Sequence, residues 1–174
     1  MATIDLIVLG MLKQEALSAY DIQKLVDYRN ISRWVKISTP SIYKKVIQLE
    51  EKGLIESVTV KGKMAEKAIY SLTKKGAEEF RRLMFDISSS PINIFLDLNA
   101  VIVNLAVLSP AEQKKCLRDI EANVEELKGF LEENFEQKEN RADIPASGLA
   151  VLNQQYALVQ AIESWLLKVK KQTM

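Results

Sequence analysis

Apolar residues recur at helical spacing through most of the chain and alternate with polar residues in one short region. Thr3 to Leu12 (TIDLIVLGML) is nearly continuously apolar and too short to span a membrane, which predicts a helix buried on most sides. Ser18 is a candidate N-cap for a second helix, with Asp21 in its first turn. The apolar face of this second helix comprises Tyr20, Ile22, Leu25 and Val26.

A third helix is predicted over about Thr39–Lys52. Thr39 supplies an N-cap hydroxyl and Pro40 stands at the first helical position, where its missing N–H costs nothing. Gly53 is a helix stop. One narrow face is predicted to be buried, because three apolar residues repeat at i, i+4 and i+7: Ile42, Val46 and Leu49.

Two β-rich runs follow, LIESVTV from Leu54 and AIYSLT ending at Thr73, on either side of a basic loop. Thr73 then caps a fourth helix, whose apolar row is Phe80, Leu83, Met84 and Ile87. Ser88-Ser-Ser-Pro91 breaks this pattern. The boundary is placed there, with one domain over residues 1–88 and a second over residues 89–174.

The pattern of residues 89–174 predicts helices throughout. Asn93 to Leu108 predicts a largely buried helix, and Ser109-Pro-Ala-Glu112 is a capping box that opens a long helix. Along this long helix an apolar seam alternates steps of three and four residues: Leu117, Ile120, Val124, Leu127 and Leu131. The seam covers about two heptads, which favours packing of a helix pair over a fibrous rod.

The last helix, about Ser147 to Lys170, carries two apolar rows. One contains Leu152, Tyr156, Val159, Ile162, Leu166 and Val169, and the other Val151, Leu158 and Trp165. Two rows require two neighbours, and a second subunit is one source of such a neighbour. The predicted dimer interface is therefore Val151, Leu152, Leu158, Val159, Ile162, Trp165 and Leu166, and the alternative is the core of a bundle within one chain.

The composition limits the classes of function. The 174 residues are 48% hydrophobic and contain no run of about 18 apolar residues, and the N-terminus lacks the pattern of a secretory signal, so we expect a soluble, cytoplasmic protein. With no histidine and one cysteine, acid–base and metal chemistry are disfavoured, and we expect neither an enzyme nor a cofactor or metal. Cys116 is interpreted as a packing residue, with a redox cross-link as the alternative.

Charge is distributed unevenly along the chain. Residues 1–85 hold 15 Lys and Arg against 10 Asp and Glu, a net charge of +5, whereas residues 86–174 carry −4. A basic first half indicates an anionic partner for that half, although a charge of this size is also common on solvated surfaces.

The N-terminal order of three helices, strand, basic loop, strand and helix is that of a winged helix-turn-helix. The predicted fold class is therefore mainly α with a small β-hairpin, an N-terminal winged helix-turn-helix followed by a C-terminal all-helical dimerisation domain. In this fold the third helix enters the major groove of DNA and the wing, about Leu54–Thr73, lies on the backbone or minor groove. The candidate DNA-binding residues are Thr39, Ser41, Tyr43, Lys44, Lys45, Ile47, Gln48, Lys61, Lys63 and Lys67.

TPSIYKKVIQLEEKGLIES resembles the recognition-helix signature of the PadR family of transcriptional regulators. LIVLGML with AYDIQK, and YSLTKKG after the wing, are similar to that family too. The length and the acidic second half resemble its subgroup with a larger C-terminal domain, the virulence-activator type. Two features depart from the family pattern. Ala19 stands where the family commonly has glycine, and Lys45 and Ile47 look exchanged relative to the family's usual small and basic residues, so the family does not predict the base preference of this chain.

The resemblance implies a homodimer that binds a two-fold operator, usually as a repressor, with Tyr43 contacting the DNA backbone beside Ser41 and Lys44. Dimerisation in the family runs through the C-terminal helices, and some members respond to a small aromatic or hydrophobic effector. Trp34, Phe95, Tyr156 and Trp165 are candidates to line an effector pocket, although for each alone a core or interface role is favoured. The alternative function is a winged-helix protein-interaction module that does not bind DNA.

Overall fold

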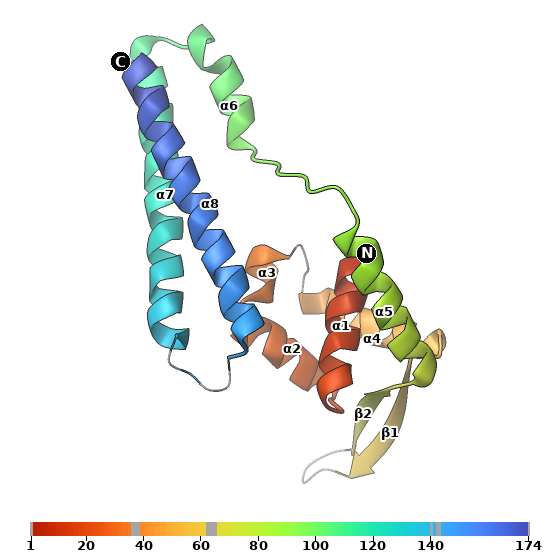
Figure 1. The fold of residues 1–174 in the computed structure, drawn as a ribbon. Coiled ribbons are helices and arrows are strands. Elements are labelled where there is room, and N and C mark those ends of the chain that lie inside the picture. Colours follow the sequence, from red (N-terminus) through yellow and green to blue (C-terminus); the bar gives the residue numbers. More distant parts are fainter. Residues whose placement is uncertain (1, 36–38, 62–65, 140, 142–143, 174) are drawn as a thin grey trace. The chain divides into compact units, whose positions relative to one another are not determined.

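The chain folds into two compact units in a computed structural model, Met1–Ile92 and Asn93–Met174, and each is described by itself (Figure 1). The structure describes residues 2–35, 39–61, 66–139, 141 and 144–173. The boundary predicted after residue 88 coincides with the last residue of helix α5 (Lys74–Ser88).

The N-terminal unit confirms the predicted fold class of a winged helix-turn-helix. Its helices are α1 (Ala2–Gln14), α2 (Ala19–Tyr28), α3 (Ile31–Trp34), α4 (Thr39–Glu51) and α5 (Lys74–Ser88), and its strands are β1 (Ile55–Lys61) and β2 (Glu66–Leu72). Helix α3 was not predicted, because a single turn is too short to show apolar periodicity. It follows Asn30, which adopts a left-handed conformation with φ 53°.

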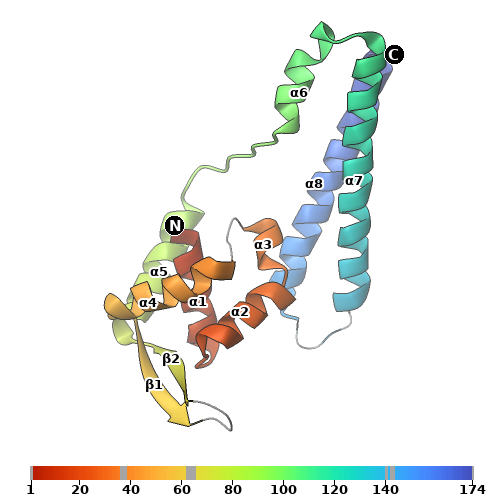
Figure 2. The ribbon, with the colours of Figure 1, turned by 180° about the vertical axis from the view of Figure 1, so that it is seen from behind.

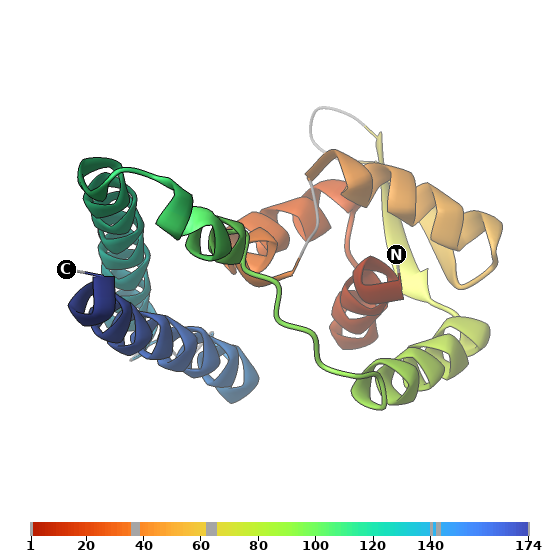
Figure 3. The same ribbon diagram turned by 90° about the horizontal axis from the view of Figure 1, so that it is seen from above.

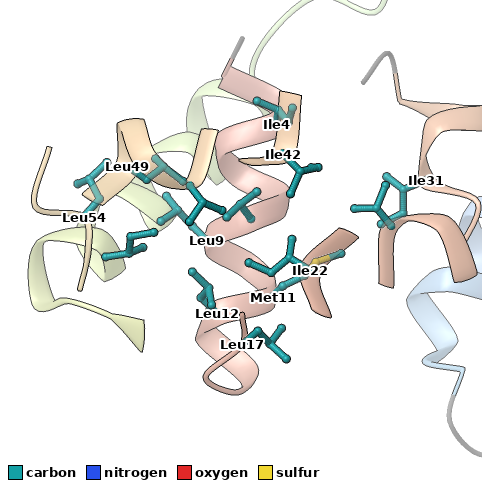
Figure 4. Close-up of a cluster of buried hydrophobic side chains, with 14 of the residues drawn as sticks. Ile4, Leu9, Met11, Leu12, Leu17, Ile22, Ile31, Ile42, Leu49 and Leu54 are labelled. Atoms are coloured by element: carbon teal, nitrogen blue, oxygen red, sulfur yellow. The ribbon is translucent and has the colours of Figure 1, made fainter. Parts of the chain in front are cut away.

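Helix α1 lies at the centre of the first hydrophobic core and contacts several elements (Figure 4). Val8, Leu9 and Leu12 of α1 are buried against residues of α2 and α4, including Ile22, Val26, Ile42 and Leu49. A helix covered on more than one side needs apolar residues around most of its circumference, which explains the nearly continuous run from Thr3 to Leu12. Helix α5 contributes Leu83 and Phe80 to this core, whereas Met84 of the same predicted row is 48% exposed.

The hairpin is antiparallel and leaves the core from its base (Figure 2). Ile55 pairs with Leu72 at the base, Ser57 with Tyr70, and Lys61 with Glu66 at the far end. Leu17, just before α2, makes two backbone hydrogen bonds with Tyr70 and so extends the sheet on the β2 side. Both strands reach further than predicted, so that Lys61 and Lys67 lie in the strands instead of in the loop.

The C-terminal unit contains α6 (Leu98–Asn104), the 3₁₀ turn η1 (Leu105–Val107), α7 (Pro110–Lys138) and α8 (Ala146–Thr173). Helices α7 and α8 run antiparallel side by side (Figure 3). The capping box at the start of α7 is confirmed, because the Glu112 carboxylate accepts hydrogen bonds from the backbone N–H and the hydroxyl of Ser109. The predicted seam of α7 is buried against α8 except for Leu127, which is 44% exposed.

The prediction of one largely buried helix over Asn93–Leu108 is wrong. Residues 91–96 are not helical, and α6 contains no buried residue. Several apolar side chains of this segment are exposed in the single chain: Ile94, Phe95, Val101, Val103 and Val107. Apolar composition predicts that a segment will be covered, but it does not say that the cover comes from the same chain.

Candidate nucleic-acid interface

Helix α4 has one face in the core and the opposite face in solvent. Ile42, Val46 and Leu49 are at most 1% exposed, as their spacing predicted. On the other side Tyr43 is 43% and Ile47 53% exposed, Lys44 is exposed, and Gln48 is half-buried. This solvent-facing row combines a phenol, an ammonium group, an aliphatic side chain and an amide, which are groups that can contact phosphates and base edges.

Lys45 does not belong to this row. Its side chain is only 10% exposed, and its Nζ lies 2.8 Å from Oδ1 of Asp5 on α1, whose side chain is 15% exposed. The ammonium group of Lys45 is directed into an ion pair between two helices, so the structure gives no support to the prediction of Lys45 as a DNA-binding residue. Its role is to join α4 to α1.

Three predicted residues cannot be placed. Helix α4 begins at Thr39, but the side chains of Thr39 and Ser41 are outside what the structure describes. Lys63 also falls outside the described residues. Their proposed contacts with DNA remain predictions.

The described part of the wing presents two lysines. Lys61 is exposed at the end of β1. The Lys67 side chain on β2 is 54% exposed, and its Nζ lies 3.6 Å from Oδ2 of Asp21 near the start of α2. The Ser18 hydroxyl and backbone N–H, together with Lys67, hold the pKa of Asp21 below its ordinary value despite an opposing contribution from burial. Asp21 is therefore ionised at neutral pH, and Lys67 has a neighbour of opposite charge.

Helix α2 adds a feature that was not predicted from the sequence. Lys24 Nζ lies 4.7 Å from the centroid of the Tyr20 ring, and Tyr20 is 55% exposed. Because Ile22 and Val26 face the core shared with α4, the Tyr20–Lys24 pair lies on the solvent side of α2. The i, i+4 spacing of an aromatic residue and a lysine was the available signal, but Tyr20 was assigned to the apolar face.

The corner between α4 and β1 fixes where the wing begins. Gly53 has φ 67°, and the N–H groups of Gly53 and Leu54 donate to the carbonyls of Glu50 and Leu49 at 2.8 and 2.9 Å. This pattern ends the helix and needs a residue that tolerates a left-handed conformation. The Thr73 hydroxyl donates to the carbonyl oxygens of Gly53 and Leu54, which connects the corner to the start of α5.

Sequence comparison identifies this winged unit. Residues 8–82 match the transcriptional regulator PadR-like family, and this range runs from within α1 to within α5 and includes α2, α3, α4, β1 and β2. The winged unit is therefore PadR-like over the matched residues. Members of the family are transcriptional regulators, so the expectation of a protein that is not an enzyme is confirmed. A comparison with curated protein sequences gives no match.

Solved structures share the fold of this PadR-like chain over nearly its whole length. PadR of Bacillus subtilis in complex with operator DNA has a TM-score of 0.84 and 19% identity, with 99% of each chain covered. The PadR-like regulator BC1756 of Bacillus cereus has a TM-score of 0.70 and 24% identity, covering 100% of this chain and 97% of the other. The virulence activator AphA of Vibrio cholerae has a TM-score of 0.75 and 19% identity, with 95% of each chain covered.

The predicted dimer residues of the PadR-like chain divide into two groups on α8. Val159 and Leu166 are 1% and 2% exposed and face α7 of the same chain, with Leu152, Ile162 and Trp165 packed against that core. For Val159 and Leu166 the intrachain alternative accounts for the burial, so the structure gives no support to their prediction as dimer contacts. Leu158 is 38% exposed and Val151 is half-buried, so the second predicted row retains free surface.

The four predicted effector residues are not gathered into one described cavity. Trp34 belongs to the N-terminal unit, and Phe95 is 86% exposed. Tyr156 packs edge-on against Phe135, with ring centroids 5.9 Å apart, and its hydroxyl donates to Glu132 at 2.9 Å. Trp165 packs against the α7–α8 core. A shallow hollow on these helices is lined by other residues: Glu121, Val124, Glu125, Glu163, Leu166 and Leu167.

Within the part of the chain that the structure describes, no helix is both long and apolar enough to cross a membrane.

Proposed function

We propose that this protein is a cytoplasmic, homodimeric DNA-binding regulator of transcription that acts as a repressor. The observation that carries the proposal is the solvent-facing row Tyr43, Lys44 and Ile47 on α4, a helix whose opposite face is anchored in the core of a PadR-like winged unit. A similar fold in the Bacillus subtilis PadR structure is in complex with operator DNA, which supports DNA as the partner here.

In this proposal α4 lies in the major groove of a two-fold operator. Lys44 reaches a phosphate or a guanine edge, Gln48 an adenine and Ile47 a thymine methyl group, while Tyr43 contacts the backbone. Lys61, Lys63 and Lys67 of the wing, and the Ser41 side chain at the start of α4, add phosphate contacts. Lys24, beside Tyr20 on the solvent side of α2, is a further candidate for a phosphate contact.

Dimerisation is proposed to use apolar side chains that the single chain leaves exposed. On α8, Leu158 is exposed and Val151 is half-buried in the single chain, and the exposed Phe95, Val103 and Val107 precede α7. Covering such side chains with a second copy removes apolar surface from water, at roughly 25 cal/mol per Å². A two-fold dimer would also present two copies of α4 to the two halves of an operator.

A small aromatic effector is part of the proposal. A Bacillus subtilis PadR structure is in complex with p-coumaric acid, and its fold is similar to this chain with a TM-score of 0.80 and 18% identity. Phe95 has most of its ring free to contact such a ligand, and Trp34, Tyr156 and Trp165 are further candidates. Quenching of tryptophan fluorescence by a panel of phenolic compounds tests this part, and no response across the panel would contradict it for phenols.

The proposed function is tested by fluorescence anisotropy with the DNA upstream of the protein's own gene at three salt concentrations. We expect tight, salt-sensitive binding that exceeds binding to an unrelated fragment. Lys44→Glu should weaken binding and lower the salt slope by about one. Lys114→Glu, the same change at an exposed lysine on α7, is the matched control and should leave binding unchanged.

The alternative of a protein-interaction module predicts a different result. Wild-type protein would then bind neither fragment at low salt and would not be retained on heparin. The exposed Tyr43 and Ile47 could dock a partner in that case, since both are also suited to an apolar contact.

A further inference from the structure

One side-chain contact connects the last turn of α4 with the wing. The Ser57 hydroxyl on β1 donates a hydrogen bond to Glu50 Oε1 at 2.5 Å, across seven residues of sequence. Glu50 is half-buried and Ser57 is exposed. The contact therefore joins the two elements proposed to bind DNA, at a point beyond the corner where the chain turns from one to the other.

The contacts that hold the corner do not reach the outer part of β1. Gly53, Leu54 and the Thr73 hydroxyl fix the base of the wing, and Ile55 at the start of β1 is buried. From Glu56 to Lys61 every residue of β1 is exposed, so the core does not determine the direction of this part of the strand. Its direction depends on the pairing with β2 and on contacts such as Ser57–Glu50.

The two strands have separate anchors. Tyr70, the cross-strand partner of Ser57, exchanges backbone hydrogen bonds of 2.9 and 3.1 Å with Leu17, which ties β2 to the chain before α2. Burial, and to a smaller extent the charge of Glu50, raise the pKa of Tyr70, in keeping with a carboxylate close to this pair. Leu17 thus anchors β2, and Glu50 anchors β1.

We propose that the Ser57–Glu50 hydrogen bond positions the wing relative to the recognition helix, so that the contribution of Lys61 to DNA binding depends on it. The inference rests on the proposed function. Glu50 is a positioning residue here, because a carboxylate in direct contact with DNA would be repelled by the phosphates, whereas the same group can hold a strand in place. Ser57 is its partner on β1.

Ser57→Ala is the informative variant because it removes the contact without changing charge. Operator affinity should fall about three- to tenfold, the effect of losing one hydrogen bond. Lys61→Ala should lower the salt slope by about one in the wild type but cause little further loss in the Ser57→Ala background. Lys44→Ala, on the recognition helix itself, should cause the same fold loss in both backgrounds.

Two control variants separate positioning from general damage to the strand. Ser57→Thr keeps the hydroxyl and should restore wild-type affinity and the full effect of Lys61→Ala. Thr59→Ala removes a hydroxyl two residues further along the same strand face, away from the described contact with Glu50, and should leave both unchanged. An equal effect of Lys61→Ala with and without the Ser57 hydroxyl would overturn the proposal.

A second measurement does not require DNA. Hydrogen–deuterium exchange of the β1 and β2 amides should be faster in Ser57→Ala than in the wild type or Thr59→Ala, and unchanged exchange would overturn the positioning role. Absence of DNA binding by the wild-type protein would instead refute the proposed function. The exchange result would in that case still decide whether the contact holds the wing.

Discussion

Two neighbouring lysines on α4 have opposite surroundings. Lys44 is exposed, whereas Lys45 is paired with Asp5 of α1 at 2.8 Å between side chains that are 10% and 15% exposed. Lys45→Ala should lower the free energy of unfolding by about 2–3 kcal/mol, because the Asp5 side chain would lose its ion-pair partner in a largely buried place. This loss is smaller than the roughly 3–5 kcal/mol lost when a fully buried pair is broken, since both side chains retain some exposure to water.

Lys44→Ala is the matched control at the residue scale. Urea denaturation should show a change within about 0.5 kcal/mol for this surface substitution, whereas operator affinity should fall. A Lys45→Ala protein of unchanged stability and reduced affinity would place Lys45 on the DNA-binding face and contradict the structure.

At the scale of elements, the junction of α4, β1 and α5 depends on a close backbone approach at Gly76. A Cβ atom added there would lie 1.9 Å from the Leu54 carbonyl oxygen and 2.9 Å from Cδ1 of Leu72. Gly76→Ala should therefore lower the free energy of unfolding by about 3 kcal/mol or more, because a backbone carbonyl cannot move aside as a flexible side chain can. Thermal and urea denaturation measure this change.

Gly129 on α7 provides the control for Gly76. A Cβ atom at Gly129 would meet no heavy atom within 4 Å. Gly129→Ala should stabilise the protein by about 0.5–1 kcal/mol through helix propensity. Equal effects of alanine at the two positions would contradict the close approach between α5 and Leu54.

At the scale of the whole molecule, the proposed dimer is tested on two exposed leucines of α8. Leu158→Lys should shift the protein to the monomer in light scattering and weaken binding to a two-fold operator, because it places a charge in the row proposed to face a second copy. Leu167→Lys is the matched control, since Leu167 is 52% exposed and lines a hollow with Glu121, Glu125 and Glu163, where a lysine is favoured. A dimer that survives Leu158→Lys would contradict this interface.

Signals carried by neighbouring residues were the ones that sequence reasoning interpreted correctly. The Ser18 N-cap, the Ser109 capping box, the glycine stop at Gly53 and the inward row of Ile42, Val46 and Leu49 all appear in the structure. Each depends on residues within about two helical turns of one another. Apart from the single turn α3, the order of helices and strands in the N-terminal unit followed from these signals, and with it the winged fold.

Contacts between distant residues were not predictable in the same way. Lys44 and Lys45 are adjacent residues of the same type, and only the packing of α1 against α4 brings Asp5 to Lys45. The two apolar rows of α8 were recognised, but both Val159 and Leu158 were assigned to a dimer interface, although only Leu158 is exposed. The apolar segment before Ser109 was also expected to be buried. Hydrophobicity indicates that a side chain will be removed from water, but it does not indicate which segment or which chain buries it.

The sequence by itself determined the local elements, their order and the PadR-like character of the winged unit, because caps, turns and apolar periodicity act over a few residues. The tertiary structure alone decided which lysine of α4 faces solvent, which row of α8 packs on α7, and how Glu50 reaches Ser57 on the wing. The first two outcomes depend on distances between segments that are remote in sequence, and the third depends on the direction of β1 beyond the Gly53 corner. Each is decided only once the unit that contains it has packed.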